Sequence, residues 1–200
     1  YPEAIKNLNT ITQLYLSLDA PNKEVLKQVD IPLFADYWER YNQSLEYCAQ
    51  KKYRTTARLT IVKGINDMEP ENYAQLVRKG DFDFVEVKGY MHVGESQKRL
   101  PRSAMPDFEY VKEFGLKVLA FLQESGRGGE ENDYEFVSEH KPSDVILLAK
   151  KKYHKKTWID FLRFFELVNT IPSPTNLDAM AYSKVREEVK ESEKDFGVVQ

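Results

Sequence analysis

The stretch Arg58-Leu59-Thr60-Ile61-Val62-Lys63-Gly64 decides the fold of this chain. Its apolar residues Leu59 and Ile61 alternate with Arg58 and Thr60, a pattern typical of a strand with one apolar and one polar face. Residues 13–18 and 82–88 alternate in the same way. Because fully covered parallel strands usually read as continuous apolar runs, the alternation predicts polar faces turned toward a shared interior.

Amphipathic helix patterns separate and follow these strands. Apolar residues recur at three- and four-residue spacing from Asp30 to about Gln50, from Pro70 to Gly80, and from about Pro106 to Leu122. Strands that alternate with helices of this length are typical of parallel β-α units. We therefore predict the α/β class, as part of a (β/α) TIM-like barrel with parallel strands and a polar lumen.

The second part of the chain has a different pattern. A glycine-rich break at residues 126–129 separates a predicted barrel domain, residues 1–125, from a predicted α/β extension, residues 126–200. In the extension, residues 134–138 and 145–149 are expected to be two strands that form a hairpin or an edge extension. A basic run follows at residues 150–156 and an apolar helix at residues 158–168, and the charged residues 186–195 are expected to be a solvated helix or a frayed tail.

Composition limits the classes of function. The 200 residues are 42% hydrophobic, so the chain can bury a sizeable core, and no apolar run is long enough to cross a membrane. We expect a cytoplasmic protein with no membrane partner. Cys48 is the single cysteine, which excludes a disulfide framework or a cysteine-ligated metal site built from this chain alone. The net charge of −3 leaves room only for a local basic patch.

Polar residues near the ends of the strands are the first candidates for ligand binding. Ser17 and Asp19 could bind a ribose diol or an ammonium group, or Asp19 could only cap the turn before Pro21. Arg58 could bind a carboxylate in two-point fashion, or it could only pair with Glu86 on the neighbouring strand. Both alternatives are open from the sequence.

Two lysines precede glycines at strand ends. A desolvated lysine in a barrel can lose its proton and form a Schiff base with a ketoacid, which makes Lys63 and Lys88 candidate catalytic residues. Alternation turns Lys88 inward. Lys63 lies just beyond its strand, where either direction is possible.

Two basic segments are candidates for nucleic-acid binding. The loop from Gly89 to Pro106 is long for a strand-to-helix connection, and it offers aromatic and basic side chains to RNA, or it is a plain solvated loop. The run at residues 150–156 holds five lysines, which favours a nucleic-acid backbone or forms a basic turn. The candidate RNA contacts are Tyr90, His92, Lys98, Arg99 and Arg102 in the loop, and Lys151 and Lys155 in the run.

Five blocks of sequence, in this order and spacing, resemble the tRNA 4-demethylwyosine synthase family of wybutosine and wyosine biosynthesis. The resemblance covers roughly Tyr1 to Leu167. The blocks are Gln13-Leu14-Tyr15-Leu16-Ser17-Leu18-Asp19-Ala20; Pro32-Leu33-Phe34 with Tyr37-Trp38-Glu39-Arg40; Arg58 to Gly64; Phe84-Val85-Glu86-Val87-Lys88-Gly89-Tyr90 with Val93-Gly94-Glu95-Ser96; and Ser138-Glu139-His140 followed by Thr157-Trp158-Ile159-Asp160.

The resemblance implies a lyase with radical S-adenosylmethionine chemistry. In the family a 4Fe-4S cluster, held by three cysteines, cleaves S-adenosylmethionine, and two pyruvate carbons are added to N1-methylguanosine in tRNA-Phe. It implies that this chain is the carboxy-terminal part of a radical-SAM barrel, with cluster ligands outside it. It further implies that Ser17 and Asp19 contact the cofactor, that Lys63 or Lys88 meets pyruvate, that the region from Tyr90 to Arg102 faces the tRNA, and that an electron donor is a partner. Arg58 and Glu86, on the same predicted polar faces, are expected to join Ser17 and Asp19 in cofactor binding.

Because the three cluster cysteines are absent, this polypeptide alone is expected to be inactive. A truncated piece of a longer enzyme would explain their absence. The rival hypotheses are a lysine-dependent, aldolase-like barrel enzyme and a non-catalytic RNA-binding module. The first predicts trapping of pyruvate on a lysine. The second predicts salt-sensitive tRNA binding without any response to S-adenosylmethionine.

Overall fold

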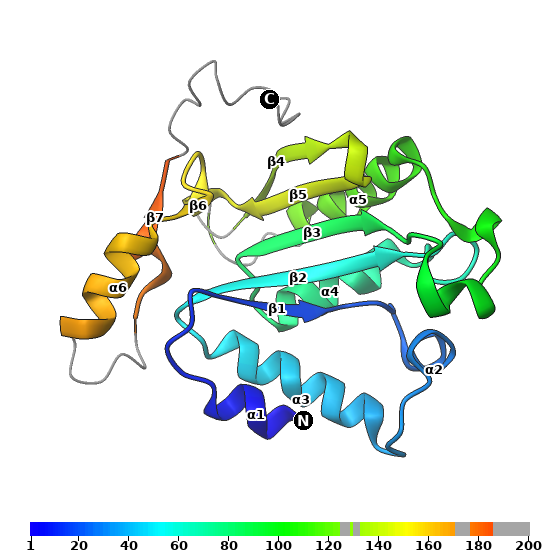
Figure 1. Cartoon of the computed structure of the whole chain (residues 1–200), viewed down its shortest axis with the longest axis horizontal. Coiled ribbons are helices and arrows are strands. Elements are labelled where there is room, and N and C mark those ends of the chain that lie inside the picture. Colours follow the sequence, from blue (N-terminus) through cyan, green and yellow to red (C-terminus); the bar gives the residue numbers. More distant parts are fainter. Residues whose placement is uncertain (125–128, 130–132, 171–176, 186–200) are drawn as a thin grey trace.

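The computed structural model describes residues 1–124, 129, 133–170 and 177–185, and its centre is a mixed sheet of five strands (Figure 1). The strand order is β1-β2-β3-β5-β4. The first three strands are parallel, β5 is antiparallel to β3, and β4 is antiparallel to β5. Their bounds are Gln13–Ser17 for β1, Arg54–Ile61 for β2, Phe84–Gly89 for β3, Tyr134–His140 for β4 and Val145–Lys150 for β5.

Each of the three parallel strands is followed by at least one helix, which returns the chain to the other end of the sheet. Helices α3, α4 and α5 cover one face of the sheet, and the short helix α1 packs beside α3 (Figure 1). Gly115 allows α5 to lie close to the sheet, because a Cβ there would meet Ile146 Cδ1 at 2.3 Å. The helices are α1, Pro2–Asn7; α2, Lys23–Asp30; α3, Tyr37–Ala49; α4, Pro70–Lys79; and α5, Phe108–Glu124.

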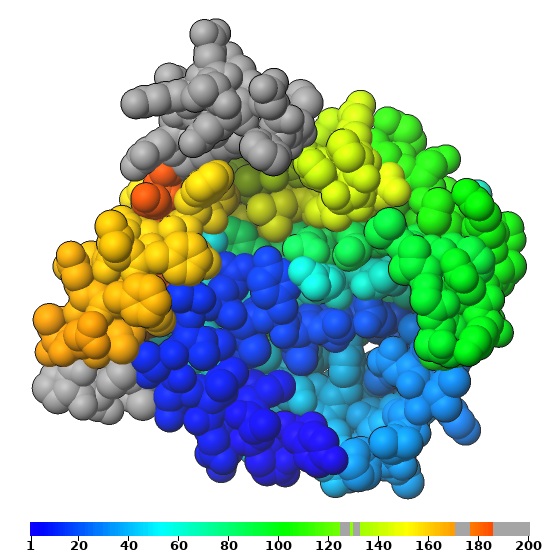
Figure 2. All heavy atoms as spheres, in the orientation of Figure 1, coloured from blue at the N-terminus to red at the C-terminus, as the bar shows by residue number. Residues whose placement is uncertain are grey.

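The core lies between these helices and the apolar face of the sheet. Leu59 and Ile61 of β2 and Val85 and Val87 of β3 are fully buried in one cluster with side chains of α3, α4 and α5. The alternation seen in the sequence is therefore confirmed. Arg58 and Thr60 of β2 and Glu86 and Lys88 of β3 lie on the opposite face. None of the described helices covers this face (Figures 1 and 2).

The sheet is open in the part of the chain that the structure describes. β1 forms one edge and pairs with β2 alone, so the α/β class and the parallel strands are confirmed, whereas a closed barrel is not formed. The hairpin expected around residues 141–144 is confirmed, since β4 and β5 pair through a short turn in which Asp144 adopts a left-handed conformation. Both strands continue the same sheet.

Two expectations about helices are wrong in detail. The sequence predicts that Asp30-Ile31-Pro32 opens a helix, but this segment closes α2, and α3 begins only at Tyr37. Ile31 has a φ of 49°, and a residue before proline is disfavoured in the helical region, so the helix stops there. The apolar helix expected at 158–168 is divided into a short strand and the helix α6, Phe161–Thr170.

The last described segments lie beside the amino ends of β1 to β3 (Figure 1). Strand β6, Trp158–Ile159, pairs with β7, Ser183–Lys184, in a separate two-stranded sheet. The expected glycine-rich break and charged end fall outside the described residues, apart from Gly129. None of the described helices is long and apolar enough to span a membrane.

Candidate functional site

The uncovered face of the sheet carries polar side chains in adjacent rows. The strand register aligns Ser17 with Arg58, and Arg58 with Glu86. One row nearer to the carboxyl ends, Thr60 is aligned with Lys88, and the Asp19 carboxylate accepts a hydrogen bond from the Thr60 backbone N–H at 3.1 Å. The structure thus brings five residues singled out from the sequence onto one surface: Ser17, Asp19, Arg58, Glu86 and Lys88.

Asp19 is held at the end of β1 by the buried side chain of Asn66. The Asn66 amide donates to the backbone carbonyls of Asp19 and Thr60, both at 2.8 Å, and its oxygen accepts from the Val62 N–H at 2.6 Å. Burial is the main reason that the pKa of Asp19 is raised to about 6. The sequence pattern does not reveal Asn66, because a lone asparagine after a strand is usual in turns.

The alternative in which Arg58 pairs with Glu86 is formed. Arg58 Nε lies 2.7 Å from Glu86 Oε1, and Nη2 lies 3.4 Å from Oε2. The Arg58 guanidinium also stacks on the Tyr15 ring, with 4.6 Å to its centroid. Burial, followed by the negative charge of Glu86, raises the pKa of Tyr15. The Arg58–Glu86 pair thus forms a charged layer between the rows nearer the amino ends, which contain Arg54 and Thr56, and the carboxyl ends of the strands.

The two candidate lysines have different surroundings. The Lys63 ammonium lies over the ring of Tyr110, at 4.8 Å from the centroid, which draws this exposed side chain toward the start of α5. Lys88 lies on the uncovered face, half-buried, and within the described ranges it has no ion-pair partner. Geometry therefore distinguishes Lys88 as the lysine that faces the polar rows.

The long loop after β3 lies at the carboxyl ends of the parallel strands, as expected from its position in the chain (Figure 1). It contains two short 3-10 turns, Gly94–Lys98 and Arg102–Ala104. Tyr90 is buried, and its hydroxyl lies 3.1 Å from both His92 Nδ1 and Ser96 Oγ. Lys98 pairs with Glu95, Arg99 donates to the carbonyl of Val29, and Arg102 is exposed.

The basic run does not join this loop. β5 runs antiparallel to β3, so residues after Lys150 lie at the opposite end of the sheet, roughly 20 Å away for a six-residue strand. Three of its lysines are already paired with carboxylates: Lys150 with Asp81 and Asp83, Lys151 with Asp133, and Lys152 with Asp83. Lys155 is exposed.

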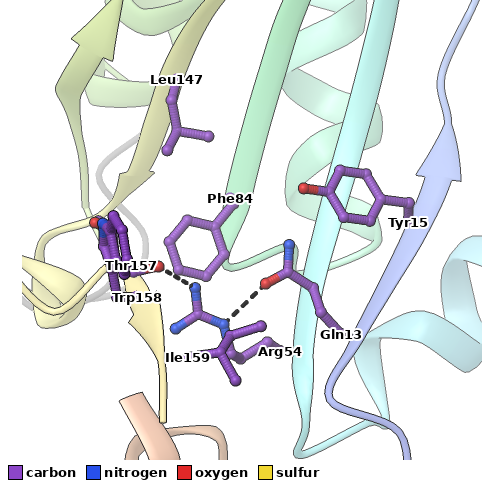
Figure 3. Close-up of a pocket in the computed structure, with 8 residues that line it drawn as sticks. All are labelled: Gln13, Tyr15, Arg54, Phe84, Leu147, Thr157, Trp158 and Ile159. Atoms are coloured by element: carbon purple, nitrogen blue, oxygen red, sulfur yellow. Dashed lines mark hydrogen bonds between the residues drawn. The ribbon is translucent and has the colours of Figure 1, made fainter. Parts of the chain in front are cut away.

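A pocket of about 270 Å³ lies on the same face at the amino ends of β1 to β3 (Figure 3). Arg54, 2% exposed, donates to the Gln13 side chain, to the Thr157 carbonyl and to Ser183 Oγ at 2.6–2.9 Å. It stacks on Phe84, 4.3 Å from the ring centroid. Burial lowers the pKa of Arg54. We interpret this pocket as the joint between sheet and extension, since parallel sheets bind ligands at the opposite ends of their strands.

Arg54 is a second residue that the sequence prediction missed. The polar alternation of β2 extends back through Thr56 to Arg54, and this signal could have placed Arg54 on the uncovered face. What the pattern could not reveal is that the partners of Arg54 come from residues 157 and 183, more than a hundred positions later.

The donors present can be compared with the cofactors expected. Asp19 and Ser17, an exposed residue, suit the ribose or ammonium groups of S-adenosylmethionine, because a carboxylate and a hydroxyl are both able to accept hydrogen bonds from such groups at the carboxyl end of β1. Cys48 does not suit an iron–sulfur cluster. It is buried in the core and burial raises its pKa to about 12. Within the described ranges, no group of His, Cys, Asp and Glu could hold a metal ion.

The fold and the aligned polar side chains of β1, β2 and β3 define the class: an α/β protein with a polar surface at the carboxyl ends of its parallel strands. Comparisons with known proteins show what this chain is similar to. Residues 79–150 match the family described as "Wyosine base formation". The chain is 40% identical over 190 residues to the S-adenosyl-L-methionine-dependent tRNA 4-demethylwyosine synthase of Schizosaccharomyces pombe, and 43% identical over 189 residues to that of Oryza sativa subsp. japonica.

This chain is a homologue of the tRNA 4-demethylwyosine synthases. The alignments include 90% of the chain but only 27% of those two relatives, so it spans about a quarter of their length. Two solved structures match 76% of the chain at 26% identity. "Structure of TYW1 with a lysine-pyruvate adduct bound" has a TM-score of 0.58 and 44% coverage of that chain, and "Crystal structure of archaeal TYW1" has 0.54 and 43%.

Proposed function

We propose that this chain is part of a radical S-adenosylmethionine enzyme that condenses pyruvate carbons with N1-methylguanosine in tRNA-Phe to form 4-demethylwyosine. The observation that carries the proposal is the convergence of Ser17, Asp19, Arg58, Glu86 and Lys88 on one face, in a chain with synthases among its relatives. Residues 1–125 would supply part of the barrel and residues 126–200 an extension. An electron donor completes the set of partners.

Ser17 and Asp19 bind S-adenosylmethionine in this proposal. The cofactor, together with a 4Fe-4S cluster ligated outside this chain, supplies the radical chemistry. Asp19 is pre-positioned for the task, because Asn66 fixes its backbone and Thr60 holds one carboxylate oxygen. Arg58 and Glu86 pair with each other and form the polar surface below the cofactor. Because their charges cancel, this pair adds no net charge to the binding site.

Lys88 contacts pyruvate in preference to Lys63. Its ammonium group lies on the uncovered face one row above Glu86, where a substrate carboxylate would meet a cation. Lys63 is held over Tyr110 and serves as a second candidate at the rim.

The tRNA approaches the carboxyl ends of the strands, where the modified base must reach the cofactor. His92 and the cations Lys98, Arg99 and Arg102 are the contacts that the loop offers there, while Tyr90, expected from the sequence to contact the RNA, is buried and holds His92 in place. Lys151 and Lys155 lie at the other end of the sheet and would reach only a distant part of the tRNA backbone.

A chimera tests the proposal. The 190-residue segment of the S. pombe synthase that aligns with this chain is replaced by this chain in a strain lacking the native enzyme, and 4-demethylwyosine derivatives in tRNA-Phe are measured by mass spectrometry. We expect the base to be formed. Asp19→Ala and Lys88→Ala should each reduce it at least about tenfold, while Lys63→Ala has a smaller effect.

Lys117→Ala is the matched control, because Lys117 is exposed on α5 and, among the described residues, pairs with Glu113 alone. A folded, soluble chimera that forms no modified base would contradict the proposal. Equal activity of Asp19→Ala and the parent chimera would remove Asp19 from the cofactor site.

A further inference from the structure

Three side chains of the loop after β3 form one hydrogen-bonded chain. The Tyr90 hydroxyl lies 3.1 Å from His92 Nδ1 and 3.1 Å from Ser96 Oγ, and Ser96 Oγ lies 2.5 Å from the carbonyl oxygen of Val93. Tyr90 is 7% exposed and packs with Val62 and Ala104, so its hydroxyl is held in place. The chain of hydrogen bonds therefore ends at the imidazole of His92, a half-buried residue.

The number of protons fixes the direction of every bond in this chain. Each hydroxyl has a single proton. The Ser96 proton is donated to the Val93 carbonyl, which can only accept, so Ser96 Oγ must accept from Tyr90. The Tyr90 proton is then used, and the Tyr90 oxygen must accept from His92. His92 consequently carries its proton on Nδ1, and in the neutral ring Nε2 has a free lone pair.

The backbone of His92 is held as firmly as its ring. The Val93 N–H donates to the Met91 carbonyl at 2.9 Å, which closes a three-residue turn centred on His92. The Gln97 side chain donates to the His92 carbonyl at 2.9 Å. Among the described residues, Nε2 itself has no hydrogen-bond partner. The loop thus presents one preformed acceptor at the carboxyl ends of the strands.

We infer that His92 is a specificity residue that accepts a hydrogen bond through Nε2 from an N–H group of a nucleobase, with its tautomer set by Ser96 through Tyr90. The inference rests on the proposed function. A phosphate group offers only acceptors and would not pair with a bare lone pair, whereas a base amino or imino group donates. The adjacent Met91 and Val93, 52% and 58% exposed, add apolar surface for a planar ring.

The tautomer can be measured without RNA. Long-range nitrogen–proton NMR spectra of the full chain distinguish a neutral ring with the proton on Nδ1 from one with the proton on Nε2. We expect the Nδ1–H form for His92, although an unconstrained imidazole favours Nε2–H. Ser96→Ala frees the Tyr90 proton to be donated to Nδ1 and should invert the tautomer. Ser96→Thr keeps the hydroxyl and is the matched control.

Binding of RNA tests the role of the acceptor. The probe is a fluorescent anticodon stem-loop with N1-methylguanosine at the position to be modified, titrated with the full chain. Ser96→Ala should weaken binding about tenfold although His92 is still present, because Nε2 becomes a donor. His92→Gln keeps an acceptor and should stay within about threefold of the parent, whereas His92→Arg, a donor-only cation, should not.

Each outcome has one meaning. A dominant Nε2–H form in the parent chain overturns the inference whatever the RNA does. An inverted tautomer in Ser96→Ala with unchanged RNA affinity, or tight binding by His92→Arg, overturns the nucleobase contact. If the parent chain binds no RNA, the proposed RNA contact of the loop fails and the nucleobase assignment fails with it. The tautomer result still reports on the hydrogen-bonded chain.

Discussion

Asn66→Ala should strongly destabilise this protein and release Asp19. Asn66 is fully buried and makes three hydrogen bonds, to the Val62 N–H and to the carbonyls of Asp19 and Thr60. Truncation leaves these three backbone groups without partners. Because each buried unsatisfied group costs about 1–3 kcal/mol, we expect the three together to lower the free energy of unfolding by at least about 3 kcal/mol. That is a large fraction of the roughly 5–15 kcal/mol typical of a domain.

Urea denaturation followed by circular dichroism measures this loss. Asn9→Ala is the matched control, because Asn9 is exposed, and it should change the free energy of unfolding by less than about 0.5 kcal/mol. Asn66→Asp keeps the shape of the side chain but turns a carboxylate oxygen toward two carbonyls, so it should be at least as destabilising as alanine. A loss below about 1 kcal/mol for Asn66→Ala would refute the reasoning that the hydrogen bonds of Asn66 hold the end of β1 against β2.

Three further predictions concern charged and reactive groups. The pKa of Asp19 in the folded state is raised to about 6, so the folded state binds this proton more tightly than the unfolded state does, and the free energy of unfolding should fall by about 2–3 kcal/mol as pH rises from 4 to 7. The urea midpoint of Asp19→Asn should lack this fall with pH. A midpoint of Asp19→Asn that falls with pH as steeply as that of the parent chain would contradict the assignment. Cys48, with its pKa raised to about 12, should react with a thiol reagent only after unfolding, and rapid reaction in buffer would show that the core opens there. Asp83→Asn should lower the free energy of unfolding by about 2–4 kcal/mol, because Asp83 pairs with the buried Lys150 and with Lys152. As a control, Glu113→Gln removes an exposed ion pair and should cost under about 0.5 kcal/mol in the same urea denaturation measurement.

The local pattern is sufficient for the strands and for the face that each residue occupies. Alternation in β2 and β3 depends only on the two-residue period of a strand, and this period places Leu59 and Val87 in the core and Arg58 and Glu86 opposite them. The predicted starts of α4 and α5 are also close, because Pro70 and the residues after Pro106 carry local signals for a helix start. The predicted start of α3 is wrong because the left-handed Ile31 before Pro32 ends one helix rather than opening another.

The sequence by itself determined the α/β class, the polar face and the order of blocks that points to the synthase family, because these depend on near neighbours in the chain. Only the tertiary structure decided which partners meet across long separations. It paired Arg58 with Glu86, anchored Arg54 to residues near Thr157 and Ser183, and placed the lysine run at the end of the sheet opposite His92. The physical reason is the strand pairing: its direction and register determine which distant side chains share a surface, and no local period encodes them.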